Sequence, residues 1–260
     1  MLLAADKVRL EFPRAKGGTV VALDDVTFSV EPNEFTVIVG PSGCGKSSLL
    51  YLIGGLHEPT AGSIALSGKP VRGPGPDRGM VFQSFTLFPW LTVRENIAFG
   101  LRQKSLPQPE ISAIVERYIR DVGLTEFADA HPKQLSGGMK QRVALARAMA
   151  NDPEMLLMDE PFGSLDSQTR MVMQELLLTI WEQQHKTVLF VTHDIDEAIL
   201  LGDRVIVMTA RPGRIKSDIP ISLPRPRNPD IVLSQGFLAI KRAILDLLHE
   251  EVIRSLALPG

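Results

Sequence analysis

The stretch FTVIVGPSGCGKSSLL, residues 35 to 50, decides the fold. Its first five residues are apolar or β-branched, which is typical of a strand buried on both faces. A loop with three glycines follows, and the apolar spacing after Lys46 then predicts a helix. The helix residues expected to turn toward the core are Leu49, Leu50, Ile53 and Leu56. A buried strand that enters a helix through such a loop is typical of an α/β core.

The loop in this stretch, GPSGCGKS, fits the pattern G-x-x-x-x-G-K-[ST] and predicts a phosphate-binding site. Glycines let successive backbone N–H groups turn toward a cluster of oxygens that a Cβ would obstruct. The helix N-terminus adds the positive end of its dipole, and Lys46 supplies a charge for the β- and γ-phosphates of ATP. We expect Ser47 to ligate Mg²⁺ through its hydroxyl. The residues expected to bind nucleotide here are Gly40, Pro41, Ser42, Gly43, Cys44, Gly45, Lys46, Ser47 and Ser48.

Cys44 is the only cysteine among the 260 residues, so this sequence can form no internal disulfide and no zinc site built from cysteines. Two interpretations of its thiol stay open. It is either an inert small side chain, or a reactive thiol whose pKa is lowered by the helix N-terminus and Lys46.

Beyond this stretch, short strand-like runs dominate the first eighty residues, and helical patterns fill residues 92 to 150. Apolar strands then alternate with helices, which predicts a parallel sheet covered on both faces. The expected fold class is therefore an α/β phosphate-loop NTPase core with an N-terminal antiparallel β-subdomain and an inserted α-helical subdomain. We expect the ATPase domain to span residues 1–215, with the helical subdomain at about 85–150.

Residues 216–260 are expected to form a C-terminal linker and an amphipathic helix. The linker part, within ARPGRIKSDIPISLPRPRNPD, is rich in prolines and turn residues. Phe237, Ile240, Ile244 and Leu247 recur at helical spacing and are expected to share one face of the final helix.

Polar residues follow three of the predicted strands. Asp159 and Glu160 end the apolar run EMLLMDE, and because side chains alternate along a strand they are expected to play different roles. We expect Asp159 to hold Mg²⁺ and Glu160 to orient or deprotonate the attacking water. His193, after VLFVT, is placed to contact the γ-phosphate, and Gln83, after GMVF, is a further ligand for Mg²⁺.

A second phosphate cradle is predicted at QLSGGMKQRVALARAMA, residues 134 to 150, where no strand precedes the helix. Ser136, Gly137 and Gly138 would present a hydroxyl and backbone N–H groups at a helix N-terminus. A serine that only caps the helix fits the same residues.

The order of these motifs resembles the ATP-binding subunits of ABC transporters, over roughly residues 5 to 215. The resemblance implies that two such subunits stack head to tail around two ATP molecules. Ser136, Gly137 and Gly138 of one subunit would then face the γ-phosphate held by the other, with Asp166 across the same interface. It also implies an aromatic residue stacked on adenine, for which Phe12 is the candidate; a core position is equally compatible with Phe12.

The stretch FQSFTLFPWLTVRENIAFGL is similar to the transporter members of this family, in which this region receives a helix of a membrane-spanning permease subunit. Phe85, Phe88, Pro89 and Trp90 are expected to form that surface, although a subdomain core would use the same residue types. The resemblance is strongest to importers of nitrate, sulfonate or taurine, and bicarbonate. It implies a peripheral protein on the cytoplasmic face of the inner membrane, working indirectly with a substrate-binding protein.

Net charge and hydropathy limit the alternatives. A formal net charge of −2 gives no electrostatic argument for nucleic acid as a partner. No run approaches the roughly 18 apolar residues of a membrane span. A soluble mechanical ATPase of the same family and an exporter subunit remain the alternative functions.

Overall fold

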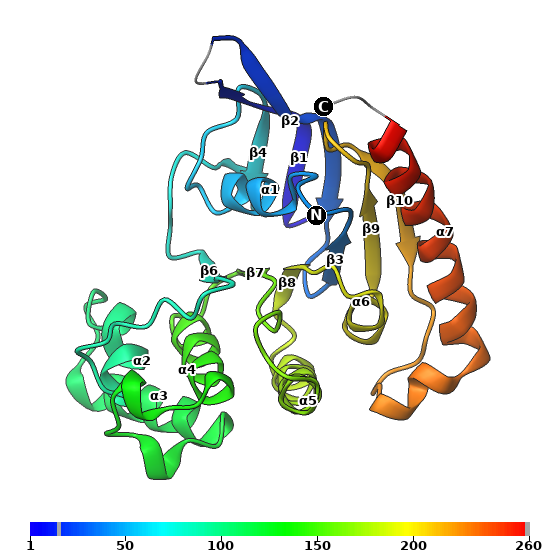
Figure 1. Ribbon diagram of the computed structural model, residues 1–260. Coiled ribbons are helices and arrows are strands. Elements are labelled where there is room, and N and C mark those ends of the chain that lie inside the picture. Colours follow the sequence, from blue (N-terminus) through cyan, green and yellow to red (C-terminus); the bar gives the residue numbers. More distant parts are fainter. Residues whose placement is uncertain (15–16, 258–260) are drawn as a thin grey trace. The chain divides into compact units, whose positions relative to one another are not determined.

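The computed structural model describes residues 1–14 and 17–257, which fold as two compact units (Figure 1). The first unit combines Met1–Gly75 with the chain from His185 onward, and the second spans Pro76–Gln184.

The first unit contains an antiparallel sheet with the strand order β2-β1-β4-β5. Its central strand β1 pairs with β2 on one side and with β4 on the other. Leu3 and Val8 of β1 and Val30 of β2 are fully buried. The strands are β1 (Leu3–Pro13), β2 (Thr19–Val30), β4 (Ala61–Leu66) and β5 (Lys69–Pro70). The predicted antiparallel β-subdomain is therefore present.

A second sheet of the first unit carries the phosphate loop. Strand β3 pairs in parallel with both β8 and β9, and β10 runs antiparallel along β9. All residues of β3 and β8 are buried, as expected for parallel strands covered on both faces. The strands are β3 (Phe35–Val39), β8 (Thr187–Val191), β9 (Arg204–Met208) and β10 (Ile215–Pro220).

Helix α1 (Lys46–Ile53) leaves the phosphate loop and contacts β8, and α6 (Ile195–Leu201) packs on β3 and β9. The prediction for Leu56 was wrong, because this side chain is 44% exposed. The helix ends at Ile53, and Gly55 turns the chain with a φ of 74° against the carbonyl of Gly73. The helical spacing therefore stops before Leu56.

The segment expected to be a linker forms part of the sheet. Residues 215–220 form the edge strand β10, in which polar Lys216, Ser217 and Asp218 hide the strand pattern. The helix that follows, α7 (Gln235–Ala257), packs beside α6 and β9 through the buried Phe237 and Ile244. Ile240 and Leu247 are half-buried on this helix.

Arg227 anchors the chain between β10 and α7. Its buried guanidinium donates to the carbonyls of Ile199, Leu200 and Gly202 at the end of α6, and to those of Ile221 and Leu223. Burial lowers the pKa of Arg227 to about 10. The carbonyls at the C-terminus of α6, which lack partners within the helix, are thereby satisfied.

The second unit holds two parallel strands and most of the helices. Strands β6 and β7 pair in parallel, while α2 packs on α3 and α4. Thr92 and Glu95 form a capping box at the start of α2. The elements are β6 (Arg78–Val81), α2 (Val93–Leu101), α3 (Gln108–Asp121), α4 (Gly137–Ala150), β7 (Met155–Asp159) and α5 (Ser167–Gln184). No described helix in either unit is long and apolar enough to cross a membrane.

Candidate functional site

The phosphate loop follows β3 directly and depends on its glycines. Gly43 and Gly45 have φ values of 74° and 104°, a region that side chains with a Cβ rarely adopt. A Cβ at Gly45 would also lie 2.7 Å from a methyl carbon of Leu23. Gly45 caps α1 without a side-chain hydrogen bond. The helix N-terminus therefore begins at the loop without a capping side chain on Gly45, as an anion site requires.

Lys46 is buried within this loop. Its ammonium donates to the carbonyl oxygens of Gly40 at 2.9 Å and Pro41 at 3.2 Å. An ammonium has three donors, so these two bonds are compatible with a further bond to a phosphate oxygen. Lys46 thus holds its charge at the loop that the sequence assigns to phosphate.

The thiol of Cys44 fits the inert interpretation. The residue is 1% exposed, and burial raises the pKa of the thiol despite the opposing charge of Lys46. Its sulfur lies close to Gly40, where an added Cβ would come within 2.8 Å. Since the thiolate is the nucleophile, a raised pKa and a buried sulfur both act against reactivity.

His193 and the phosphate loop lie at the same edge of the sheet. His193 follows β8, which is the parallel neighbour of β3, so the residues after both strands meet at their carboxyl ends. The side chain of His193 is exposed. The adjacent Asp194 caps α6 by accepting from the Glu197 N–H. This edge is where ligands of open α/β sheets bind.

Phe12 is not a core residue, because 39% of its surface is exposed. Its ring meets that of His57 edge to face at 6.2 Å, and His57 in turn lies 5.9 Å from Tyr51 of α1. An exposed ring supported by two others is compatible with stacking on a base.

In the second unit, Asp159 and Gln83 follow neighbouring strands. Asp159 is the last residue of β7 and is 2% exposed. Gln83 is exposed and comes two residues after β6 ends, so it lies in the bend beyond the strand. Glu160 is half-buried and has a φ of 42°. A carboxylate and an amide oxygen at one sheet edge are ligands that Mg²⁺ accepts.

The second cradle is built at the N-terminus of α4. The hydroxyl of Ser136 accepts from the Met139 N–H at 3.3 Å, so Ser136 caps the helix. A hydroxyl that accepts can still donate its own proton, so the cap and the anion-binding interpretations are compatible. Gly138 lies against Thr169 of α5, where a Cβ would come within 2.6 Å of its methyl carbon.

Asp166 lies at the start of α5, near this cradle. It accepts from the Thr169 N–H at 3.0 Å and from the Thr169 hydroxyl at 2.7 Å. These bonds lower the pKa of Asp166. A cavity of about 410 Å³ adjoins both elements, and its lining includes Ser136, Arg142 and Thr169.

The predicted site residues thus divide between the units. Those of the first unit are Phe12, the loop Gly40–Ser48 and His193, and those of the second are Gln83, Ser136, Gly137, Gly138, Asp159, Glu160 and Asp166. The prediction missed Arg211, whose guanidinium donates to the Gly43 carbonyl at 3.2 Å. The only signal in the sequence was the turn RPGR after β9.

Comparison with known proteins identifies the family of this chain. The model of the ABC transporter family matches residues 23–163, more than half of the chain. The chain belongs to the ABC transporter family. It is an ATP-binding subunit of that family and an ATPase. An ABC transporter ATP-binding protein of Methanocaldococcus jannaschii is 54% identical over 92% of this chain and 89% of its own length.

Two further relatives carry names of cargo. A nitrate import ATP-binding protein of Synechocystis sp. is 51% identical over 80% of this ABC subunit and 79% of its own length. A bicarbonate transport ATP-binding protein of Synechococcus elongatus is 46% identical over 96% of this chain and 38% of its own length. A solved dimeric ATP-binding cassette bound to ADP and phosphate is 33% identical, with a TM-score of 0.75 over 86% of this chain and 100% of that chain.

Proposed function

We propose that this subunit powers the import of a small anion, of the class of nitrate, a sulfonate such as taurine, or bicarbonate. The observation that carries the proposal is the identity of 46–51% to subunits named for nitrate import and bicarbonate transport. The site chemistry supports the energy source of this import and does not distinguish among cargoes, because the roles assigned to its residues concern ATP and not the cargo.

For hydrolysis we assign roles to residues of both units. Lys46 and the loop N–H groups hold the phosphates, and His193 contacts the γ-phosphate. Ser47, Gln83 and Asp159 would hold Mg²⁺, which would neutralise charge on the β- and γ-phosphate oxygens. Glu160 orients the attacking water. Most of this catalysis is electrostatic and positional, because phosphoryl transfer asks little covalent chemistry of a protein.

We further propose a head-to-tail pair of these subunits. Ser136 and Gly138 lie at the N-terminus of α4, where Ser136 and Gly137 are exposed and Gly138 is buried, and a helix N-terminus favours an anion. In the pair they would complete the site of the partner, so that binding of ATP drives closure. The solved dimeric cassette noted above supports this assembly.

An aromatic patch, formed by Phe88, Trp90 and Phe99, fits the docking of a permease on the cytoplasmic face of the inner membrane. Trp90 is 69% and Phe99 41% exposed, and their rings lie 5.7 Å and 4.3 Å from that of Phe88. Exposed aromatic clusters of this kind mark sites of protein association. Phe85, also expected in this surface, is half-buried.

The patch is connected to the second cradle through Arg147 of α4. Its guanidinium lies 5.5 Å over the Phe88 ring and donates to the carbonyl and hydroxyl of Thr86. Burial lowers the pKa of Arg147. Since Ser136 caps the same helix, a helix docked on the patch would be linked to the cradle through Arg147 of α4.

The experiment is purification of the tagged chain from its native membranes in mild detergent, with identification of every co-eluting protein. We expect a multi-span membrane protein to co-elute in an amount nearly equal to that of the tagged chain. It should no longer co-elute with the Trp90→Ala variant. Leu233→Ala is the matched control, because Leu233 is 79% exposed outside the patch. A chain that stays in the soluble fraction without such a partner would favour the mechanical ATPase instead.

The cargo class is tested separately, by uptake of labelled nitrate, taurine and bicarbonate into cells that lack the chain. The wild-type chain should restore uptake of one of them, and Glu160→Gln should restore none. Efflux of a compound in place of uptake would identify an exporter.

A further inference from the structure

The loop that joins β9 to β10, residues 209–214, lies against the phosphate loop of the same unit. Arg211 donates from Nη2 to the carbonyl oxygen of Gly43 at 3.2 Å. Gly213 lies close to the carbonyl of Cys44, the next residue, since a Cβ added to Gly213 would lie 2.1 Å from that carbonyl oxygen. Two successive carbonyls of the phosphate loop therefore face this connection.

The direction of these carbonyls determines the direction of two N–H groups. In a planar trans peptide the C=O and the N–H point in opposite directions. The Gly43 carbonyl therefore directs the Cys44 N–H away from residues 209–214, and the Cys44 carbonyl does the same for the Gly45 N–H. The Cys44 N–H points to the Pro41 carbonyl at 3.3 Å, a long bond that a charged phosphate oxygen would outcompete.

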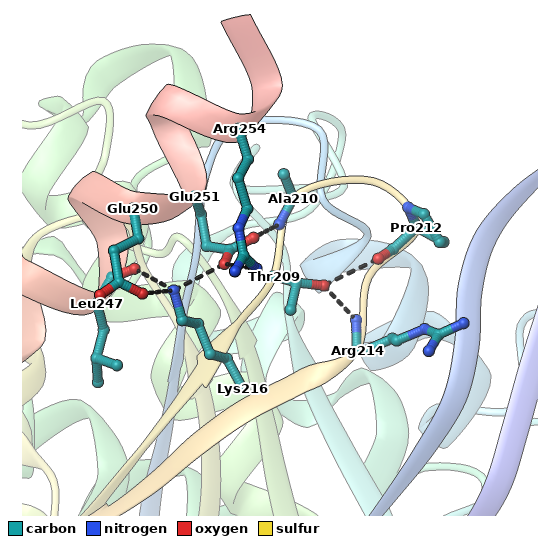
Figure 2. A network of polar contacts seen from close by, with 9 residues as sticks. All are labelled: Thr209, Ala210, Pro212, Arg214, Lys216, Leu247, Glu250, Glu251 and Arg254. Carbon is teal, nitrogen blue, oxygen red and sulfur yellow. Dashed lines mark hydrogen bonds and ion pairs between the residues drawn. The ribbon is translucent and has the colours of Figure 1, made fainter. Parts of the chain in front are cut away.

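The connection is held firmly on the side of the sheet. The hydroxyl of Thr209 donates to the Pro212 carbonyl and accepts from the Arg214 N–H, both at 2.9 Å (Figure 2). The Gly213 N–H donates to Ala22 at 2.9 Å, and the Gly213 carbonyl accepts from the Asp24 N–H at 3.0 Å. These bonds fix the backbone from which Arg211 extends.

Helix α7 holds the same connection from the other side, as Figure 2 shows. The Ala210 N–H donates to Oε2 of Glu251 at 3.0 Å. The Glu251 carboxylate is 3% exposed and lies 2.7 Å from the Lys216 ammonium. Lys216 also reaches Glu250 and the Leu247 carbonyl, both at 2.8 Å. The residue next to Arg211 is thus bonded to the terminal helix.

We propose that Arg211 is a positioning residue for ATP, acting through the Gly43 peptide, and that Glu251 anchors it through Ala210. The side chain of Arg211 holds the peptide plane that aims the Cys44 N–H into the phosphate cradle. The terminal helix thereby takes part in nucleotide binding without contacting the nucleotide. This inference rests on the assignment of the phosphates to residues 40–48.

The test is equilibrium binding of ATP and of inorganic triphosphate to the full chain, by competition with a fluorescent ATP analogue. Arg211→Ala should weaken both ligands by about fivefold, the scale of one exposed charge-assisted hydrogen bond. Both should weaken alike, because the cradle contacts phosphate and not the base. Arg211→Lys should recover part of the loss. Glu251→Ala should weaken both in the same direction by a smaller factor.

The matched control is Arg214→Ala on the same connection, since the Arg214 guanidinium pairs with Asp24 of β2. It should bind as the wild type does. The unfolding midpoint of nucleotide-free Arg211→Ala should equal that of the wild type, which a merely structural role would not give.

Three outcomes would overturn the inference. If Arg211→Ala binds ATP as tightly as Arg214→Ala does, while Lys46→Ala loses ATP binding, the role of Arg211 is refuted. The assignment of the phosphate site is then unaffected. If nucleotide-free Arg211→Ala has a lower unfolding midpoint than the wild type and Arg211→Lys recovers none of the lost binding, Arg211 has a structural role only. Lys46→Ala that binds ATP normally would refute the phosphate site itself, and this inference with it. Wild-type binding by Glu251→Ala would remove the anchoring role alone.

Discussion

Glu160 combines an unusual backbone with the position proposed for the catalytic carboxylate. Its φ of 42° lies in the left-handed region, where residues other than glycine are uncommon. Such conformations cluster at functional sites, where the surrounding structure imposes them. Asp159, directly before it, is buried at the end of β7. The two adjacent acids therefore face different surroundings, as separate roles in Mg²⁺ binding and water activation require.

Glu160→Gln is expected to slow ATP hydrolysis by at least about 100-fold, the scale of a lost general base. ATP binding should persist, because the amide keeps the shape of the side chain, and an ATP-bound dimer should accumulate. Hydrolysis assays and size-exclusion chromatography in Mg-ATP measure both effects. Glu154→Gln, an exposed acid just before β7, is the control. Only monomer at saturating ATP, with nucleotide bound, would contradict the head-to-tail pair.

Cys44 should resist alkylation in the native protein at pH 8. Its sulfur is buried and its pKa is raised by that burial, so little accessible thiolate is present. Mass spectrometry after iodoacetamide treatment should find modification only once the chain is unfolded in guanidinium. Labelling of the native protein that ATP suppresses would restore the reactive interpretation.

Among the elements, α7 depends on a charge pair that titrates. Burial alone would raise the pKa of Glu251, but bonds from Lys216 and Ala210 outweigh it and lower the pKa below the ordinary 4.5. Burial would lower the pKa of Lys216, yet Glu250 and Glu251 raise it above 10.5. The carboxylate therefore contributes stability above pH 4.5, lost as pH falls through its folded pKa. The ammonium of Lys216 contributes stability below pH 10.5, and this stability is lost as the pH rises through the pKa of Lys216 in the folded state.

Glu251→Gln should lower the free energy of unfolding at pH 7 by about 1 kcal/mol, or the unfolding midpoint by roughly 2–4 °C. The difference from the wild type should shrink as pH falls from 4.5 toward 3, because the wild-type carboxylate then protonates. Thermal unfolding across this range measures it. Asp246→Asn on the same helix, where Asp246 is 63% exposed in its pair with Arg242, should change the midpoint by less. A gap that stays constant with pH would contradict the charge pair.

Elements with strong local patterns were predictable from the sequence. The apolar runs of β3, β7 and β8 gave buried strands, and α4 begins where the sequence predicts a helix N-terminus at the second cradle. Strand β10 was missed because its middle residues are polar and because, among the described strands, it pairs with β9 alone. Leu56 was misplaced because helical spacing was extended past the Gly54–Gly55 turn.

The parts of the site that consist of residues adjacent in the sequence were predictable. The contacts between residues far apart in the sequence were not. The phosphate loop reads directly from contiguous residues, since its glycines, lysine and helix occur together. The contact of Arg211 with Gly43 joins positions 168 residues apart. No local pattern encodes such a contact, because it arises from the pairing of β9 with β3.

At the scale of the whole molecule, a head-to-tail pair predicts complementation between two inactive variants. Lys46→Ala removes the phosphate charge, and Gly138→Ala places a Cβ 2.6 Å from the Thr169 methyl carbon in the cradle. A mixed pair would hold one intact site, formed by Lys46 of one chain and the cradle of the other. Random mixing makes half of the pairs mixed, so up to about a quarter of wild-type hydrolysis should return.

ATPase assays of each variant alone and of the mixture measure this recovery. The control mixes Lys46→Ala with Glu160→Gln, two changes in residues proposed for the same half of one site, which should restore none. Recovery in that control would show that sites are not shared as proposed.

The sequence has two tryptophans, and the structure gives them opposite surroundings: Trp90 is 69% exposed and Trp181 5% exposed. The indole of Trp181 is shielded from water, while that of Trp90 is open to it. A collisional quencher such as acrylamide should therefore act mainly on Trp90. With Trp181→Phe the chain would carry a single tryptophan, Trp90 in the aromatic patch, which can be excited selectively over the two tyrosines. Shielding of Trp90 from the quencher would then report occupancy of that patch without any added label.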